Sequence, residues 1–284
     1  MKLQGSFLMP LVALIIFGSC SNDADDKETS TATTASEKVG NAPTATAVIL
    51  PSDAKEKKSD VAVQRLQGKV EVMSESIYSP AAGSKKLSSK NVFKYDEKGN
   101  RIELSNYRGD GILNSTIKSI YDVNGNITVE QTLLANGNVD ITSTIKTDAK
   151  GNRVEQNDKK TGNSNPLFNY KHYYKYDEKG QLIERIANRA NGAFAYKYGF
   201  KYDDKGNKTE WIRYGPDNSI LGKVVYKFDE RNNLIAETQY NPDGTVKATY
   251  AYSYELDKKN NWTRQVKMQE NKVIEIKERE IKYQ

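Results

Sequence analysis

The sequence predicts an all-β fold: a repetitive antiparallel up-and-down β-meander of about 16 strands, arranged as a twisted or curled open sheet. Three observations predict it. A turn motif recurs at near-constant spacing, alternating aromatic runs lie between its copies, and a second turn sequence falls midway in each unit. Short strands separated by regular turn signals are typical of all-β proteins. No helical period competes in the repeat region.

The first turn has the pattern Tyr-Asp-x-x-Gly-Asn, most clearly at residues 95–100. Its Asp occurs seven times, at spacings of 26, 26, 29, 26, 26 and 28 residues. An Asp can accept a hydrogen bond from a backbone N–H two residues on, and Gly at the fourth position fits a left-handed conformation. Two copies place Asn there, which tolerates positive φ better than other non-glycine residues. We therefore predict structural turn roles for Asp96, Gly99, Asp122, Gly125, Asp148, Gly151, Asp177, Gly180, Asp203, Gly206, Asp229, Asn232, Asp257 and Asn260.

The segments between these turns alternate as strands do. Residues 196–202 and 250–254 place an aromatic residue at every second position, which is the pattern of a half-buried strand. The second turn appears as Asn136-Gly137 and Asn191-Gly192, and as a longer insertion at 159–166 that explains the 29-residue spacing. Each unit therefore consists of two strands and two turns.

The Tyr-Asp-x-x-Gly-Asn units resemble YD repeats of the RHS type, over about residues 90–262. The resemblance implies a continuous antiparallel sheet that curls into a spiral or shell. Large members of that family enclose a toxin domain. This sequence has no recognisable core-closing segment and no appended effector, so the resemblance carries over only the sheet scaffold. MORN repeats are a nearby alternative, but they are shorter and richer in Gly.

Residues 1–19 are predicted to be a lipoprotein signal peptide. Lys2 precedes a short apolar run at 7–17, and small residues follow it. The run Ile16 to Cys20 resembles a bacterial lipobox, which implies cleavage before Cys20 and acylation of its thiol, with palmitate among the expected modifications. The alternatives are an ordinary signal peptide that ends nearby or an N-terminal membrane anchor.

Residues 20–60 are predicted to be the acylated Cys followed by a disordered, acidic, Ser/Thr-rich tether. The tether has no aromatic residue, and such a stretch cannot bury enough apolar surface to offset its ordering entropy. Its acidic start at 23–28 resembles the surface-export signal of some Gram-negative lipoproteins; a solvated spacer is the alternative. The expected location is therefore the outer membrane, through a lipid anchor, with the outer face favoured over the periplasmic face.

Little in the sequence predicts catalysis. A single Cys excludes an intrachain disulfide and multi-Cys metal sites, and His172 is the only His. If the strand alternation holds, His172 shares a face with Phe168, Tyr170, Tyr174 and Tyr176, so a packed or stacked histidine is the expected role. We predict no enzyme activity, no catalytic residue, no cofactor and no metal.

Residues 61–284 are predicted to be the β-hairpin repeat domain, with 37 Lys and Arg against 29 Asp and Glu. Lys alternates with Tyr on several strands, which suits an anionic ligand, although Lys and Glu that face water are the simpler explanation. We predict a binding scaffold for a glycan or a protein partner, and no nucleic acid; a purely structural envelope component is the alternative. The proposed binding face, whose rings could instead fill an inner core, comprises Tyr170, Tyr174, Tyr196, Tyr198, Tyr250, Tyr252 and Tyr254.

Overall fold

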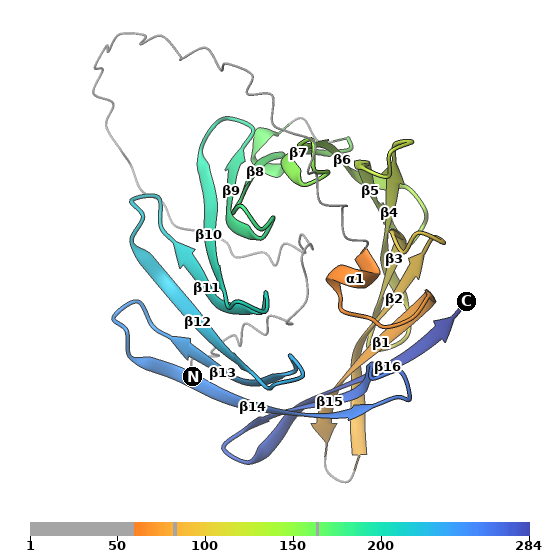
Figure 1. Cartoon of the computed structure of the whole chain (residues 1–284). Helices are drawn as coiled ribbons and strands as arrows, with labels where there is room; N and C mark the ends of the chain where they lie inside the picture. The colour runs from red at the N-terminus through yellow and green to blue at the C-terminus, as the bar shows by residue number, and fades with distance from the viewer. Residues whose placement is uncertain (1–59, 82–83, 163–164) are drawn as a thin grey trace. The chain divides into compact units, whose positions relative to one another are not determined.

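The structure, a computed structural model, describes residues 60–81, 84–162 and 165–284. These residues form 16 strands that hydrogen-bond to their neighbours in chain order and close into one antiparallel barrel (Figure 1). The elements are α1 Asp60–Val63, β1 Val70–Ala81, β2 Ser84–Tyr95, β3 Arg101–Arg108, β4 Leu113–Tyr121, β5 Ile127–Leu134, β6 Val139–Thr147, β7 Arg153–Lys160, the 3-10 helix η1 Pro166–Phe168, β8 Tyr170–Tyr176, β9 Leu182–Arg189, β10 Phe194–Tyr202, β11 Lys208–Tyr214, β12 Ile220–Phe228, β13 Leu234–Tyr240, β14 Val246–Leu256, β15 Trp262–Gln269 and β16 Lys272–Tyr283.

The prediction of an all-β, up-and-down meander of 16 strands is confirmed, but the prediction of an open sheet is wrong. β1 pairs with β16 in an antiparallel ladder that runs from Val70 opposite Tyr283 to Tyr78 opposite Ile276. This pairing removes both edges of the sheet, whose unpaired N–H and C=O groups would otherwise be exposed. The repeats therefore form a closed ring of strands instead of a spiral or shell.

The predicted signal peptide and almost all of the predicted tether, including Cys20, lie outside the described residues. The predicted boundary between tether and repeat domain, at residues 60 and 61, falls inside α1.

The seven motif turns share one hydrogen-bond pattern. In the first copy, the Gly99 N–H donates to the Asp96 carbonyl at 2.9 Å, and the Asp96 N–H donates to the Asn100 carbonyl at 2.9 Å. Oδ1 of Asp96 accepts from the backbone N–H of Lys98 and of Asn100. Gly99 has a φ of 78°, and Asn232 at the equivalent position of a later copy has 65°. This is the geometry of a type I turn followed by a G1 bulge.

In three of the seven copies, the Tyr that precedes the motif Asp links its unit to the unit before it. The hydroxyl of Tyr121 donates to the Arg101 carbonyl at 2.9 Å, and that of Tyr202 donates to the Leu182 carbonyl at 2.9 Å. Tyr176 makes the same bond to the carbonyl of Arg153. All three acceptors stand two residues after a motif Gly. The motif thus specifies contact between neighbouring hairpins as well as its own turn.

The segment before β1 identifies the inner face of the barrel. Val61 and Leu66 pack against Met73 and Tyr95 in the one buried apolar cluster of the described residues, and α1 lies inside the ring of strands (Figure 1). Directly paired residues of antiparallel strands point to the same face. Starting from Phe93 in this cluster, the register therefore assigns further side chains on each strand to the inner face, among them Leu104, Ile117, Thr132 and Ile141.

Residues 60–67 cross the end of the barrel where the motif turns lie, which we call the motif end. Val61 donates its N–H to the Gly99 carbonyl, between β2 and β3. The Arg65 guanidinium donates to the carbonyl of Gly206, between β10 and β11, at 3.0 Å. The backbone N–H of Gln67 donates to Oδ1 of Asn261, and the Gln67 carbonyl accepts from Nδ2 of the same side chain. Asn261 lies in the turn between β14 and β15. One short segment therefore joins turns from opposite parts of the ring.

Candidate functional site

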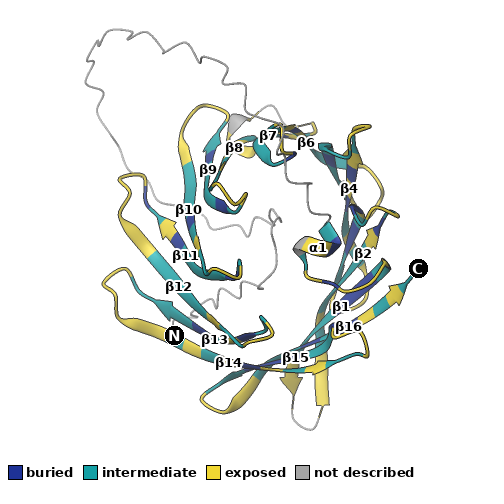
Figure 2. Cartoon of the chain, viewed as in Figure 1, coloured by how far each residue is buried: buried dark blue, intermediate teal, exposed yellow. Residues whose placement is uncertain are grey.

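Every Tyr of the predicted binding face lies on the inner face, but in two separate rows. Tyr170 and Tyr174 lie on β8 and Tyr196 and Tyr198 on β10, and they are joined through β9 because Arg185 stands opposite both Tyr174 and Tyr198. The second row, Tyr250 to Tyr254, lies on β14. Figure 2 shows that the barrel wall alternates between buried or half-buried and exposed positions. We call the inner-facing side chains of β8 to β12 the β8–β12 wall, and those of β14 to β16 the β14–β16 wall.

A row of rings runs across the β8–β12 wall. The ring of Tyr170 stacks on His172 with a centroid separation of 6.0 Å, and His172 faces Tyr196 at the same separation. Tyr196 stacks on Tyr198 at 4.8 Å, and Tyr198 meets Trp211 at 5.2 Å. These separations are those of favourable aromatic pairs. The row is half-buried apart from His172, which is fully buried.

Cations lie over several of these rings. The guanidinium of Arg185 stands 5.4 Å from the ring centroids of both Tyr174 and Tyr196, and that of Arg189 stands 5.4 Å from Tyr170. Nζ of Lys208 lies 5.4 Å from Phe200 and 5.8 Å from Tyr226. Such contacts stabilise a cation within about 6 Å of a ring.

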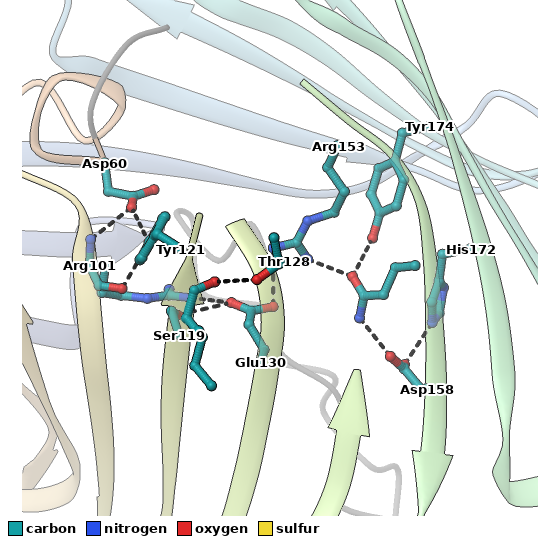
Figure 3. Close-up of polar contacts among 12 residues, drawn as sticks. Asp60, Arg101, Ser119, Tyr121, Thr128, Glu130, Arg153, Asp158, His172 and Tyr174 are labelled. Carbon is teal, nitrogen blue, oxygen red and sulfur yellow. Dashed lines mark hydrogen bonds and ion pairs between the residues drawn. The ribbon is translucent and has the colours of Figure 1, made fainter. Parts of the chain in front are cut away.

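Buried polar side chains form a network beside this row, on β3 to β8 (Figure 3). Glu130 receives hydrogen bonds or ion pairs from Arg101 at 3.0 Å and from Arg153 at 3.1 Å. Arg153 donates to Oε1 of Gln156, which also accepts from the hydroxyl of Tyr174. Arg101 lies on β3, Glu130 on β5 and Arg153 on β7, so these ion pairs connect alternate strands across the inner face.

The network ends in a carboxylate, an imidazole and a phenol. Oδ2 of Asp158 lies 2.8 Å from Nε2 of His172, and Nδ1 of His172 lies 3.1 Å from the hydroxyl of Tyr196. Burial lowers the pKa of His172, and this effect is larger than the opposite effect of the neighbouring Asp158 carboxylate. The imidazole is therefore neutral at pH 7. Burial alone would raise the pKa of Asp158, but the hydrogen bonds from His172 and Gln156 outweigh it and hold that pKa below its usual value.

The arrangement holds the hydroxyl of Tyr196 in place. Burial raises the pKa of Tyr196 well above its ordinary value, so its hydroxyl remains protonated and donates to His172. The expected packed role of His172 agrees with its full burial, although Phe168 lies in η1 and not on the strand.

The β14–β16 wall differs because each cation on it has a carboxylate partner. Lys267 pairs with Glu237 at 3.4 Å, and Lys277 lies 3.7 Å from Glu275. Arg279 pairs with Glu75 at 2.9 Å and stands 3.5 Å from the ring of Trp262. Tyr252 is 8% exposed and donates to Glu237. This row of Tyr is therefore closer to a structural core than the row on β8 and β10.

The outer face carries ion pairs in repeating positions. Lys two residues before the motif Asp stands opposite Glu four residues after the motif Gly, and the pairs Lys94–Glu103 and Lys146–Glu155 measure 2.8 and 3.2 Å. Lys201–Glu210 repeats the arrangement at 3.0 Å. Further outer-facing cations lie along the height of the wall, at Lys118, Lys171, Lys197 and Lys223.

None of the helices among the described residues has the length and apolar character of a membrane-spanning helix. The same residues also contain no group of three or more His, Cys, Asp and Glu side chains that could hold a metal ion.

Comparisons with known proteins bear on the fold. No family model matches the chain, and no curated protein matches it. A porin-like protein from Bacteroides uniformis aligns with 76% of this chain and 99% of its own, at 9% identity and a TM-score of 0.53. A porin-like protein from Bacteroides vulgatus has 12% identity and a TM-score of 0.27, covering 74% of this chain and 97% of its own. A chain of a TcdB2-TccC3-Cdc42 complex covers 72% of this chain but 14% of its own, at 11% identity and a TM-score of 0.28.

Only the first of these scores is high enough to show a shared fold, and at 9% identity it shows the fold alone. That fold is a porin-like closed barrel of 16 antiparallel strands. Together with the pairing of β1 and β16, it overturns the identification of the repeats as RHS-type YD repeats. The recurring turn motif is real, but turn chemistry alone does not distinguish a closed ring from a spiral.

Sequence reasoning missed the polar network, although a signal for it was present. Arg101 and Arg153 both stand two residues after a motif Gly, within the matching segments Gly99 to Glu103 and Gly151 to Glu155. A cation repeated on the inner-facing position of a strand indicates a buried partner. That partner, Glu130, lies in a unit whose own motif gives no sign of it.

Proposed function

We propose that this chain is a lipid-anchored binding protein of the outer membrane, whose barrel offers its inner wall to a glycan or a protein partner. The observation that carries the proposal is the difference between the two faces. The inner face gathers the aromatic row from Tyr170 to Trp211, whereas the outer face carries cross-strand ion pairs such as Lys94–Glu103. Half-buried rings beside fixed polar groups are typical of ligand sites.

The same difference supports an anchor on Cys20 in place of insertion through the bilayer. A membrane-spanning barrel has an outward-facing apolar band about 25 Å tall, and a Lys at its midplane costs about 2–4 kcal/mol. Here the outer-facing positions include Lys118, Lys171 and Lys197. A porin-like fold fits an outer-membrane protein, and the lipid on Cys20 would supply the attachment. The acidic start of the tether supports display on the outer face.

Replacing the lipid attachment tests this location. Residues 1–20 are exchanged for a signal peptide that is cleaved before Ser21 and adds no lipid. We expect to find the wild-type chain in the membrane fraction and the exchanged chain as a free protein. Both chains should pass the same tests of correct folding. An exchanged chain that stays in the membrane after a carbonate wash would show that the barrel itself inserts, and the anchor proposal would fail.

Binding is tested with matched tyrosine variants on a glycan array. Tyr198 lies in the inner row, stacked between Tyr196 and Trp211, whereas Tyr173 on β8 faces outward and is 42% exposed. We expect Tyr198→Leu to lose the glycan signal of the wild type and Tyr173→Leu to keep it. Equal signals from both variants, or no glycan signal from the wild type, would contradict a glycan site on the inner wall.

A purely structural envelope component is the second candidate. The β14–β16 wall favours it, because Lys267, Lys277 and Arg279 each have a carboxylate partner and leave little for a ligand to satisfy. We also propose that the chain is not an enzyme, since His172 has a buried, neutral imidazole held between Asp158 and Tyr196.

A further inference from the structure

The two tyrosine rows of the inner face differ in how their neighbouring cations are balanced. On the β14–β16 wall, the carboxylates of Glu237, Glu275 and Glu75 accompany the cations. On the β8–β12 wall, no carboxylate of the described residues forms an ion pair with Lys208 or Arg213. The imbalance is local, because the same face of the same sheet is neutralised a few strands away.

The charge on Lys208 is energetically unfavourable because the side chain is largely removed from water. Burial lowers the pKa of Lys208, and the rings of Phe200 and Tyr226 are its recorded contacts. Removing a charge from water is unfavourable unless an opposite charge or hydrogen bonds replace the water. A negative group that approached this amine would provide that replacement.

Arg213 extends the positive charge towards solvent. It stands directly opposite Tyr198 on one side and Gly222 on the other, and its side chain is exposed. Gly222 has no side chain to cover the guanidinium. A Cβ at that glycine would meet only one backbone oxygen, at 3.8 Å, so the space beside Arg213 is open.

The rings beside these cations form a row. Tyr196 and Tyr198 stack at 4.8 Å, and Tyr198 meets Trp211 at 5.2 Å with a tilt of 39°. Apolar faces of sugar rings pack against aromatic side chains, and guanidinium and ammonium groups bind carboxylate, sulfate or phosphate groups. The row of rings and the cations therefore suit two different parts of one ligand.

We propose that the β8–β12 wall is the ligand site of this barrel and that its ligand is an acidic glycan chain, whose rings pack against the row formed by Tyr198 and Trp211 and whose anionic groups pair with Arg213 and Lys208. This inference rests on the proposed function and deepens it, because it assigns one wall and one charge class of glycan. The β14–β16 wall serves as structure.

The test measures binding of the purified full-length chain to polygalacturonate and to the same polymer with its carboxylates methyl-esterified. The variants are Arg213→Gln and Lys208→Met, and Lys227→Gln is the matched control because it removes one exposed outer-facing charge from β12. We expect polygalacturonate to bind at least tenfold more tightly than the ester. Each inner variant should weaken binding at least fivefold, the control should match the wild type, and all chains should melt cooperatively.

The outcomes separate this inference from the proposed function. Equal binding of polymer and ester, with loss in Tyr198→Leu, would retain glycan binding and overturn the acidic ligand. Failure of polygalacturonate and of heparin to bind would overturn it as well, and a blank glycan array would additionally remove the proposed function. A single-stranded DNA oligonucleotide that binds more tightly than either glycan, with the same dependence on Arg213, would replace the glycan by nucleic acid.

Discussion

His172 and Asp158, side chains of neighbouring strands β8 and β7, meet at 2.8 Å on the inner face with almost no exposure to solvent. The contact joins a neutral imidazole, which donates through Nε2, to a carboxylate that also accepts from Gln156. The hydroxyl of Tyr196 completes the arrangement by donating to Nδ1. A buried pair of this kind makes the stability of the barrel depend on pH.

The first prediction concerns that pH dependence. Burial lowers the pKa of His172 in the folded chain, so below about pH 6.5 the unfolded chain binds a proton that the folded chain does not. The free energy of unfolding should therefore fall as the pH drops from 7.5 to 5.5, by at most about 1.4 kcal/mol per pH unit. Urea unfolding at both pH values measures it.

The variant His172→Gln provides the control, because the chain contains no other His. Its amide can still donate to Asp158, but it does not titrate. We expect its free energy of unfolding to change much less over this pH range. A variant with the same pH slope as the wild type would show that another group is responsible. Asp158, whose pKa is also lowered, should add a loss only below about pH 4.

The second prediction concerns the hydrogen bonds between repeats. Tyr202→Phe removes the bond to the Leu182 carbonyl and should lower the free energy of unfolding by about 1 kcal/mol. Burial raises the pKa of Tyr202 to about 12, so its hydroxyl donates at all ordinary pH values. Tyr95 in the first copy is the matched control. Its buried hydroxyl approaches Gln64 without forming a hydrogen bond to any described residue.

Tyr95→Phe should therefore be neutral or slightly stabilising, since it removes an unsatisfied buried hydroxyl. Thermal or urea unfolding of both variants gives the comparison. If Tyr95→Phe were as destabilising as Tyr202→Phe, the hydroxyl-to-carbonyl bond would not explain the recurrence of Tyr in the motif.

The sequence was sufficient to predict the strands and turns because their determinants are local. Asp96 and Gly99 make their contacts within one turn, and alternation in residues 196–202 reports the face of one strand. Closure of the barrel depends instead on Val70 meeting Tyr283 at the other end of the domain. No local pattern distinguishes two free edges from two edges that pair with each other.

The inner wall shows the same division. The tyrosine rows were predictable from alternation, and both lie on the inner face. Which row has compensated charges was not predictable, because the partners come from different units: Glu75 of β1 pairs with Arg279 of β16, and Glu237 of β13 with Lys267 of β15. Sequence separation hides such pairs even where the repeat is regular.

The third prediction uses a turn glycine that no neighbour crowds. Gly180 has a φ of 75°, and a Cβ there would meet no atom within 4 Å, so a substitution tests backbone strain alone. Gly180→Val should lower the free energy of unfolding by about 1–2 kcal/mol. Gly180→Asn should lower it much less, because Asn232 already occupies the equivalent position with a φ of 65°. Equal melting temperatures for the two variants would contradict this explanation of the turn.

The fourth prediction concerns the segment that crosses the motif end. Arg65 donates to the carbonyls of Gly206 and Asn232, which belong to two neighbouring turns. Arg65→Ala should speed amide hydrogen exchange at 203–207 and 229–233, because both turns lose a shared partner. The turn at 148–152 is the internal control, since it makes no hydrogen bond with residues 60–67 in the described structure. Faster exchange in all three turns would indicate general destabilisation instead of the loss of the hydrogen bonds that Arg65 makes.

The last prediction compares a buried carboxylate with an exposed one. Glu130 has a side chain that is 5% exposed and accepts from both Arg101 and Arg153, so Glu130→Gln leaves two buried guanidinium groups facing an amide. Removing one partner of a buried ion pair typically costs about 3–5 kcal/mol. Glu103→Gln breaks the outer-facing pair with Lys94, whose side chain is 49% exposed, and should cost less than about 1 kcal/mol. Urea unfolding separates these outcomes. Similar losses in both variants would mean that the inner network adds no more to the stability of the barrel than a solvated ion pair.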